Sequence, residues 1–150
     1  MANVQASSTS FKVEVLNGIH ALGTTVIRAA TTLDSFKAAL YFATASLGAG
    51  TTAYSATGEV TGTGYTAGGI AVTNATAPTS TGTTAFWTPS AALAWTTVTI
   101  AAFDAVLLYN STQSNKAVAT FTFGSQTVTA GNFTLNMPTN DATTGLLRLS

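Results

Sequence analysis

The stretch AVLLYNSTQSNKAVATFTF, residues 105–123, gives the clearest indication of the fold. Its first part, AVLLY, is a continuous apolar run, which is typical of a strand buried on both faces or covered by a neighbouring subunit. In its last part, AVATFTF, the side chains of Phe121 and Phe123 fall on one face, and those of Thr120 and Thr122 fall on the other. Both parts therefore predict β-strands.

The same strand-forming composition continues along most of the chain. Short segments rich in Thr, Val and aromatic residues recur about every 8–12 residues, separated by Gly, Pro and Asn, as in β-sandwiches and barrels. We expect Ala75–Gly82 to be a loop and Phe123–Gln126 to be a hairpin turn. The expected strands are Thr24–Ala29, Ser35–Ala45, Tyr65–Asn74, Thr84–Thr88, Thr96–Ala101, Ala105–Tyr109, Ala117–Phe123, Gln126–Thr129, Phe133–Met137 and Leu146–Leu149. Gly58–Thr63 fits either a short strand or a turn.

The N-terminal part of the chain differs from the rest. Met1–Ser10 is small and polar, and we interpret it as a mobile or partner-bound arm. Phe11–Leu22 fits both strand alternation and helical spacing. A serine in the N-cap position and an acidic residue near the first turn favour a short helix that ends near Gly23.

The chain has 150 residues, which favours a single domain. We predict an all-β fold over residues 24–150, as one antiparallel β-sandwich or jelly-roll-like domain. Residues 1–23 are expected to form the arm and short helix that precede it. A chain of this length removes roughly 68–70% of its unfolded surface from water on folding, which is enough for a real core.

Charged residues make up only 7% of the chain and the net charge is zero, whereas about 25% is usual. Neutrality gives no reason to expect nucleic acid or an anionic membrane as a partner. The mean hydropathy is +0.35, yet no apolar run approaches the ~18 residues of a spanning helix. No signal peptide is expected. The absence of cysteine excludes disulfides, thiolate catalysis and Cys-based zinc sites.

The low charge also bears on the surface, because soluble monomers normally carry many surface charges. Either a compact Thr-coated domain happens to be neutral, or much of its surface is covered by other subunits. We favour the second interpretation. The only lysines that could blunt exposed strand edges are Lys12, Lys37 and Lys116. Loops and bulges must therefore hide those edges, or neighbouring copies must cover them.

The ionisable residues are too few and too scattered to predict an enzyme. No G-x-S-x-G motif occurs, and one histidine without cysteine makes a transition-metal site unexpected. We interpret that histidine as a packed or capping residue. The chain is expected to have no catalytic, cofactor-binding or metal-binding residues. The acids are Glu14, Asp34, Glu59, Asp104 and Asp141, and the histidine is His20.

Two motifs resemble functional signatures without their context. The stretch Gly62–Gly69, GTGYTAGG, is similar to a dinucleotide-binding fingerprint, but the strand-like Ile70–Thr73 follows it where a helix is required. We expect these glycines to supply positive φ angles or a bulge. Formal glycosylation sequons begin at Asn74, Asn110 and Asn132, and we interpret all three as turn residues.

Most of the chain resembles a family of small virion structural proteins of tailed bacteriophages. The resemblance covers FKAALYFATASLGAGTTAYSATGEVTGTGYTAGG within Leu33–Gly69 and AVLLYNSTQSNKAVATFTFGSQTVTAGNFTLNMPTNDATTGLLRLS over Ala105–Ser150, and SFKVEVLNGIHAL near the N-terminus also fits. The block TAYSATGEVTGTGYTAGG is its most specific part. The resemblance implies a non-enzymatic virion protein, made in the bacterial host cytoplasm and best placed on the capsid exterior as a decoration or cement protein.

The partners implied are the major capsid protein and further copies of this chain, with a trimer as the expected oligomer. No cofactor, nucleic acid or membrane is expected. Met1–Ser10 and Leu146–Ser150 are candidate contact elements, and the second could add a strand to a neighbouring sheet. The alternative is a tail or fibre module that binds a host receptor or glycan. It would need an exposed aromatic cluster, whereas we expect the aromatic residues to fill the core and subunit contacts.

Overall fold

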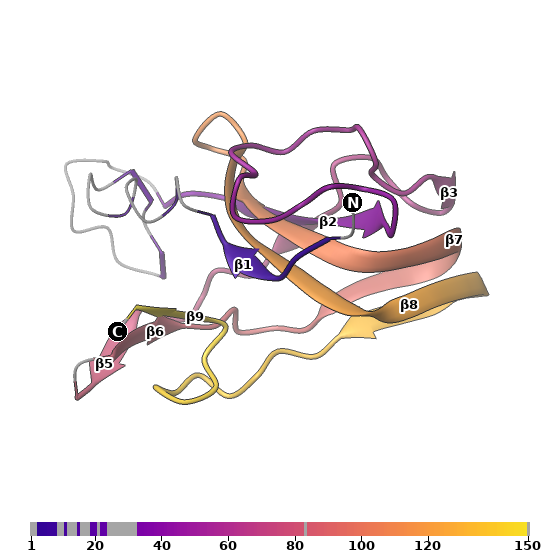
Figure 1. Cartoon of the computed structure of the whole chain (residues 1–150). Helices are drawn as coiled ribbons and strands as arrows, with labels where there is room; N and C mark the ends of the chain where they lie inside the picture. Colours follow the sequence, from indigo (N-terminus) through magenta and orange to yellow (C-terminus); the bar gives the residue numbers. More distant parts are fainter. Residues whose placement is uncertain are drawn as a thin grey trace.

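The computed structural model describes residues 3–8, 11, 15, 19–20, 22–23, 33–82 and 84–149. Over these residues the chain forms nine β-strands in two antiparallel sheets, which confirms the predicted all-β, sandwich-like class (Figure 1). The strands are β1 (Ala6–Ser7), β2 (Phe36–Phe42), β3 (Gly62–Thr63), β4 (Ile70–Val72), β5 (Thr79–Thr81), β6 (Thr84–Trp87), β7 (Leu93–Asn110), β8 (Lys116–Leu135) and β9 (Leu147–Leu149).

The larger sheet has six strands in the order β1-β8-β7-β2-β4, and β3 pairs with β7 beyond the end of β2. The smaller sheet has the order β5-β6-β9. Strands from both ends of the chain therefore lie at sheet edges: β1 pairs with β8, and β9 pairs with β6. These strand pairings place residues that are far apart in the sequence next to each other in the sheets.

Strands β7 and β8 are much longer than expected. The predicted strands Thr96–Ala101 and Ala105–Tyr109 are both parts of β7, and three predicted segments merge into β8. The prediction of a hairpin turn at Phe123–Gln126 is wrong, because the ladder with β7 continues through it, with Phe103 paired to Gln126. Asn132 is likewise within β8 and is not a turn residue.

The long β7–β8 ribbon bends back on itself. Phe123 and Phe133 lie ten positions apart in β8, a separation of roughly 33 Å in a straight strand. Their ring centroids are only 5.3 Å apart. The pairing register shifts several times along the ribbon, as at β-bulges, and Thr97 and Ala130 have positive φ angles of 54° and 47°. The bend, visible in Figure 1, lets one hairpin supply two facing layers.

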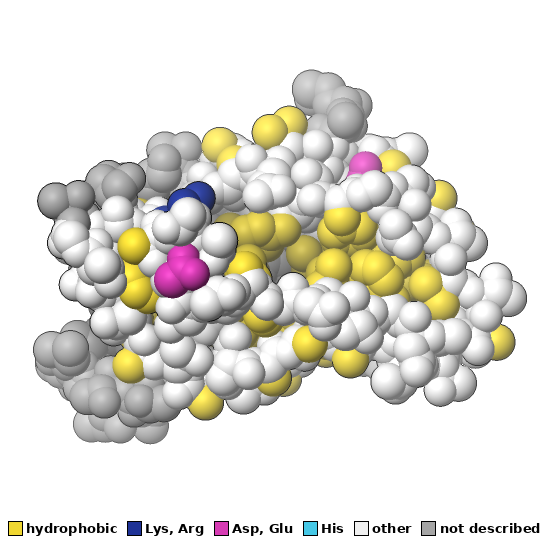
Figure 2. Space-filling view, turned by 90° about the horizontal axis from the view of Figure 1, so that it is seen from below, with side chains coloured by type: hydrophobic (Ala, Val, Ile, Leu, Met, Phe, Trp, Pro, Cys, Tyr) yellow, Lys and Arg dark blue, Asp and Glu magenta, His cyan; other side chains and the backbone are white. Residues whose placement is uncertain are grey.

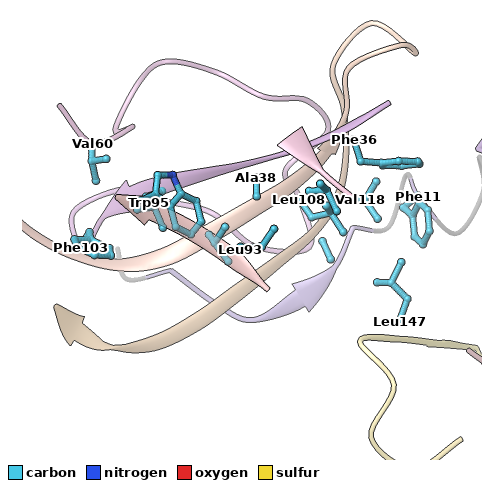
Figure 3. Packing of buried hydrophobic residues seen from close by; sticks show 14 of the residues in the cluster. Phe11, Phe36, Ala38, Val60, Leu93, Trp95, Phe103, Leu108, Val118 and Leu147 are labelled. Atoms are coloured by element: carbon cyan, nitrogen blue, oxygen red, sulfur yellow. The ribbon is translucent and has the colours of Figure 1, made fainter. Parts of the chain in front are cut away.

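The apolar run of Ala105–Tyr109 is buried throughout, which confirms its prediction as a central strand. Val106 and Leu108 join the main core cluster, whereas Leu107 and Tyr109 join a second cluster on the opposite face of the sheet. Figure 3 shows how Leu108 packs with the neighbouring core side chains from β2 and β8. The main core contains both tryptophans and several phenylalanines, in keeping with the aromatic content of the chain.

Residues 3–8 are docked on the domain, so the expectation of a mobile arm is wrong for this part of it. Ala6 pairs with Thr120 in β8. The Asn3 side chain donates a 2.7 Å hydrogen bond to Asp104 and accepts one of 3.0 Å from the backbone N–H of Leu47. These contacts fix the arm, because a buried amide needs partners for both of its polar atoms.

Two predictions near the N-terminus fall largely outside the described residues. The strand expected at Thr24–Ala29 lies entirely outside them. Of the helix expected over residues 11–22, Phe11 and Val15 are helical, whereas Ile19, His20 and Leu22 are not, so the expectation that the helix continues to near Gly23 is wrong. Phe11 is only 2% exposed and belongs to the main core, so the N-terminal segment contributes to the packing of the domain (Figure 3).

Three further strand predictions are confirmed and one loop prediction is wrong. The strands expected at Ser35–Ala45, Thr84–Thr88 and Leu146–Leu149 are confirmed as β2, β6 and β9. The expectation that Ala75–Gly82 is only a loop is wrong, since it contains β5. All three residues of β5 are exposed, so no apolar alternation could indicate a strand, and only the pairing with β6 forms it.

Candidate functional site

The described part of the chain contains seven charged residues, and two of the acids are buried. Four other charged residues are half-buried, and one is exposed. Burial of a charge requires hydrogen-bond partners, so each buried acid marks a polar cluster that can be examined as a site. The buried acids are Asp34 and Glu59, the half-buried residues are Lys37, Asp104, Lys116 and Asp141, and the exposed one is Arg148.

Glu59 is the centre of the larger cluster. Glu59 is only 5% exposed, and its carboxyl group accepts three hydrogen bonds. The donors are the hydroxyl of Tyr54 at 2.6 Å, the hydroxyl of Tyr65 at 2.8 Å and the backbone N–H of Gly68 at 2.7 Å. The Tyr65 hydroxyl in turn accepts a 3.0 Å hydrogen bond from the backbone N–H of Leu40 in β2. The cluster thus joins the glycine-rich segment to the large sheet.

The other two tyrosines of the chain complete this cluster. The Tyr109 hydroxyl donates to the carbonyl oxygen of Gly68 at 2.7 Å, and its ring stacks on Tyr54 with centroids 4.8 Å apart. The Tyr41 hydroxyl donates to the carbonyl oxygen of Ser55 at 2.5 Å. All four tyrosines therefore surround one carboxyl group, although they are spread over residues 41 to 109.

Burial keeps these phenols protonated to unusually high pH. Burial, together with hydrogen bonding to Glu59 and its charge, raises the pKa of Tyr54 to about 12. The pKa of Tyr65 is raised by burial first and by Glu59 second. Burial is also the largest cause of the raised pKa of Tyr41 and Tyr109. A tyrosine with a raised pKa is a weak acid at neutral pH, so these hydroxyls serve as hydrogen-bond donors rather than as bases.

Asp34 is the centre of the second cluster. Its carboxyl oxygens accept hydrogen bonds from the side-chain amides of Asn110 at 2.9 Å and Gln113 at 3.1 Å. The Asn110 amide nitrogen also lies 3.1 Å from Nδ1 of His20, whose ring packs edge-on against Phe11 at 4.9 Å. This geometry agrees with the interpretation of His20 as a packed residue. In these contacts, the side-chain amide of Asn110 lies between His20 and one acid, Asp34.

Asn110 has a second role, because its side-chain oxygen accepts hydrogen bonds from the backbone N–H groups of Thr112 and Gln113. This arrangement is typical of an asparagine at the start of a turn and confirms the interpretation of Asn110 as a turn residue. It also ties the end of β7 to the segment before β2. The cluster therefore holds the turn between β7 and β8 in place.

The glycine-rich segment Gly62–Gly69 wraps around the Glu59 cluster. Gly64, Gly68 and Gly69 have φ angles of 78°, 87° and 71°, which confirms the expectation of positive φ. A Cβ atom on Gly69 would collide with the carbonyl oxygen of Ala38. The glycines therefore allow close approach to the sheet, and the Gly68 backbone N–H is occupied by a protein carboxyl group.

The exterior of the described chain carries little charge. The sequence has no Asp, Glu, Lys or Arg between Val60 and Phe103, nor between Ala117 and Asn140. These two stretches supply β3 to β6, half of β7 and nearly all of β8. On the face shown in Figure 2, charged side chains occupy only a few places among uncharged polar and hydrophobic ones. One layer of the molecule is formed by β3 together with the parts of β7 and β8 that lie far from the turn joining these two strands. This layer is consequently uncharged.

The exposed aromatic cluster expected of a glycan-binding module does not form. The chain has two tryptophans, four tyrosines and eight phenylalanines, all of them within the described residues. Every one is buried or half-buried, and Trp87 and Trp95 are 1% and 3% exposed. The aromatic residues therefore fill or line the core, as one part of the expectation states, and their role in subunit contacts stays a prediction.

Across the described ranges, no group of three or more His, Cys, Asp or Glu side chains is arranged to hold a metal ion. No helix in that part of the chain is long and apolar enough to cross a membrane. The chain matches no protein-family model, no curated protein and no solved structure. Function is therefore inferred from two internal polar clusters and from the low surface charge of the described residues.

Proposed function

We propose that this chain is a non-enzymatic structural subunit of a tailed-bacteriophage particle, specifically a decoration or cement protein on the capsid exterior. It would bind the major capsid protein lattice beside further copies of itself, with a trimer as the proposed oligomer. The observation that carries the proposal is the weakly charged exterior. Among the described residues, Arg148 is the only charged residue that is exposed, since the others are buried or half-buried.

A neutral surface suits permanent contact with identical neighbours. Like charges opposed across an interface repel each other, and a patch without charges avoids this penalty against its own copies. A cement subunit binds only the assembled lattice, so mass action shifts the equilibrium towards intact particles. Many copies held on one lattice raise the effective concentration of each contact, so modest individual interfaces suffice.

The internal chemistry also supports a structural role. The Glu59 carboxyl group is used by three donors of its own chain, and Asp34 binds two amide side chains. Catalytic acids and bases normally converge on a pocket that a substrate can enter. Here the buried acids connect strands and loops to each other, which is a function in folding.

The uncharged layer is the proposed contact surface. Thr99 is exposed in β7 and pairs directly with exposed Thr63 in β3, while their neighbour Ile100 points into the core. Thr127 is exposed in β8, next to Val128, the pairing partner of Ile100. Small β-branched side chains on a paired sheet give a flat surface without long flexible groups, so little side-chain entropy is lost on contact.

The experiment is binding of the purified protein to capsids that lack it, followed by electron microscopy of the decorated particles. We expect saturable binding and ordered density on the capsid lattice. A protein that binds no capsids and is absent from purified virions would overturn the proposal. Density at the tail tip only would replace it with the tail or fibre alternative.

Matched lysine substitutions test the proposed contact surface. Thr99→Lys and Thr127→Lys together place two charges on the uncharged layer, and we expect capsid binding to weaken at least tenfold. Thr57→Lys adds a lysine at an exposed position beside Glu59 and should leave binding unchanged. Equal binding of the double variant and the native protein would reject this face while leaving the decoration function in place.

A further inference from the structure

An apolar cleft of about 170 Å³ lies where the bent β7–β8 ribbon faces β2 and β4. Side chains from both halves of the ribbon line it, together with the segment that follows β8. Figure 2 shows a hollow on this side of the molecule with hydrophobic side chains at its floor. The main lining residues are Val106, Leu108, Phe121, Phe123, Leu135 and Met137.

The cleft exists because the ribbon closes over small side chains. Ala38 in β2 is fully buried and lines the cleft with a single methyl group, and Val72 in β4 lies beside it. On the other side, Met137 and Leu146 belong to irregular segments before and after the final loop, which cover the ribbon only in part. Protein interiors are otherwise packed nearly without voids, so an open apolar space of this size is a specific feature.

The lining restricts what can enter. Its only side chains with hydrogen-bonding groups are Thr122 and Asn136, and none is charged. A peptide backbone placed here would leave N–H and C=O groups without partners, which is strongly unfavourable. Apolar cavities of about 150 Å³ in proteins stay dry and accept a benzene ring.

We propose that this cleft is a binding site for one small apolar molecule, of about the size of a single aromatic ring or a short branched hydrocarbon. The strand side of the site is preformed, because β2, β4, β7 and β8 are paired in one sheet. Binding adds van der Waals contacts with the apolar lining and needs no hydrogen bond. It does not depend on the proposed capsid function.

Toluene is a suitable probe, and Met137 is a suitable reporter because the chain contains only two methionines. With ¹³C-methyl-methionine labelling, the Met137 signal is assigned by its loss in Met137→Leu. We expect it to shift saturably with toluene. The protein should also unfold at higher temperature, and a free ligand concentration 100 times Kd raises the folding equilibrium constant about 100-fold.

Two variants and a charged analogue provide the controls. Ala38→Leu fills the cleft from β2, and Val72→Phe fills it from β4, so either folded variant should lose the toluene-dependent shift. Val72→Phe keeps the test decisive if Ala38→Leu fails to fold, since β4 is an edge strand. Benzylammonium should bind more weakly than toluene, because its ammonium group loses hydration beside a lining that offers no charged partner. The proposal is overturned if toluene gives no saturable shift up to its solubility limit, if both folded variants respond like the native protein, or if benzylammonium binds equally.

Discussion

Replacing Glu59 with alanine should destabilise the protein strongly, because three donors of the chain lose their shared acceptor. The carboxyl group accepts hydrogen bonds from Tyr54, Tyr65 and Gly68 in a cluster that is largely shielded from water. Alanine removes the acceptor and leaves all three donors behind. The loss is therefore a desolvation penalty for the donors as well as the loss of the bonds themselves.

The magnitude follows from the burial of the three donors. A buried donor left unsatisfied costs about 1–3 kcal/mol. Gly68 is buried and Tyr65 is half-buried, whereas half-buried Tyr54 can turn its hydroxyl towards water. Two penalised donors give an expected loss of about 2–6 kcal/mol in the free energy of unfolding for Glu59→Ala. A domain of this kind has about 5–15 kcal/mol in total, so this loss is large.

Glutamine at the same position should cost much less. Its amide oxygen can accept from Tyr65 and Gly68, which share one carboxyl oxygen, and its amide nitrogen then faces the Tyr54 hydroxyl, which can accept. The glutamine variant loses only the extra stabilisation that a charged acceptor gives to these hydrogen bonds. Part of this loss is offset because the folded protein no longer buries a charge. We expect about 1–2 kcal/mol.

Urea unfolding, followed by tryptophan fluorescence, measures both variants, because Trp87 and Trp95 are buried in the core. The exposed control Thr57→Ala should stay within about 0.5 kcal/mol of the native protein. A loss below about 1 kcal/mol for Glu59→Ala would refute the reasoning. So would equal losses for the alanine and glutamine variants, since the argument depends on retained acceptors.

Two further predictions concern the same region. The folded pKa of Tyr54 is about 12 and its ordinary value is 10.0, so its contribution to stability is complete below pH 10 and is lost as the pH rises towards 12. Tyrosinate absorbance and circular dichroism should show ionisation together with alkaline unfolding, and ionisation of all four phenols near pH 10 without unfolding would contradict this. Gly69→Ala should destabilise by more than about 2 kcal/mol, through positive φ and the collision with Ala38, measured by thermal unfolding. Gly124→Ala is its control, since a Cβ there meets open space, and similar losses for both variants would show that close approach is not the cause.

The local patterns of the sequence were enough to predict the class of the fold. The alternation of Ala117–Phe123 and the apolar run of Ala105–Tyr109 follow from the two-residue period of a strand, which is a local property. They indicated strands in the right places. The prediction of Ala75–Gly82 as a loop was wrong because it also depended on local pattern. All residues of β5 are exposed, so the strand has no apolar face that a local pattern could indicate.

Prediction of the polar clusters was less complete. The residues of the Glu59 cluster are visible in the sequence as an acid flanked by Tyr54 and Tyr65 at the edge of a long stretch without charges. That pattern is a usable signal for a buried acid, since a carboxyl group in such a stretch needs neutral donors. The participation of Tyr41 and Tyr109 could not be predicted, because they reach the cluster through the pairing of β2 with β7.

The sequence by itself determined that the chain is rich in short β-forming segments, has no cysteine and has few ionisable groups. Those properties follow from composition and from periods of two residues. The tertiary structure alone decided that Phe123–Gln126 bends within a continuous ribbon and does not reverse the chain as a hairpin turn. It also decided that the bend encloses an apolar cleft and that four distant tyrosines meet at Glu59. The physical reason is that strand pairing and side-chain packing join residues far apart in the chain, and no local pattern specifies which partner each strand will choose.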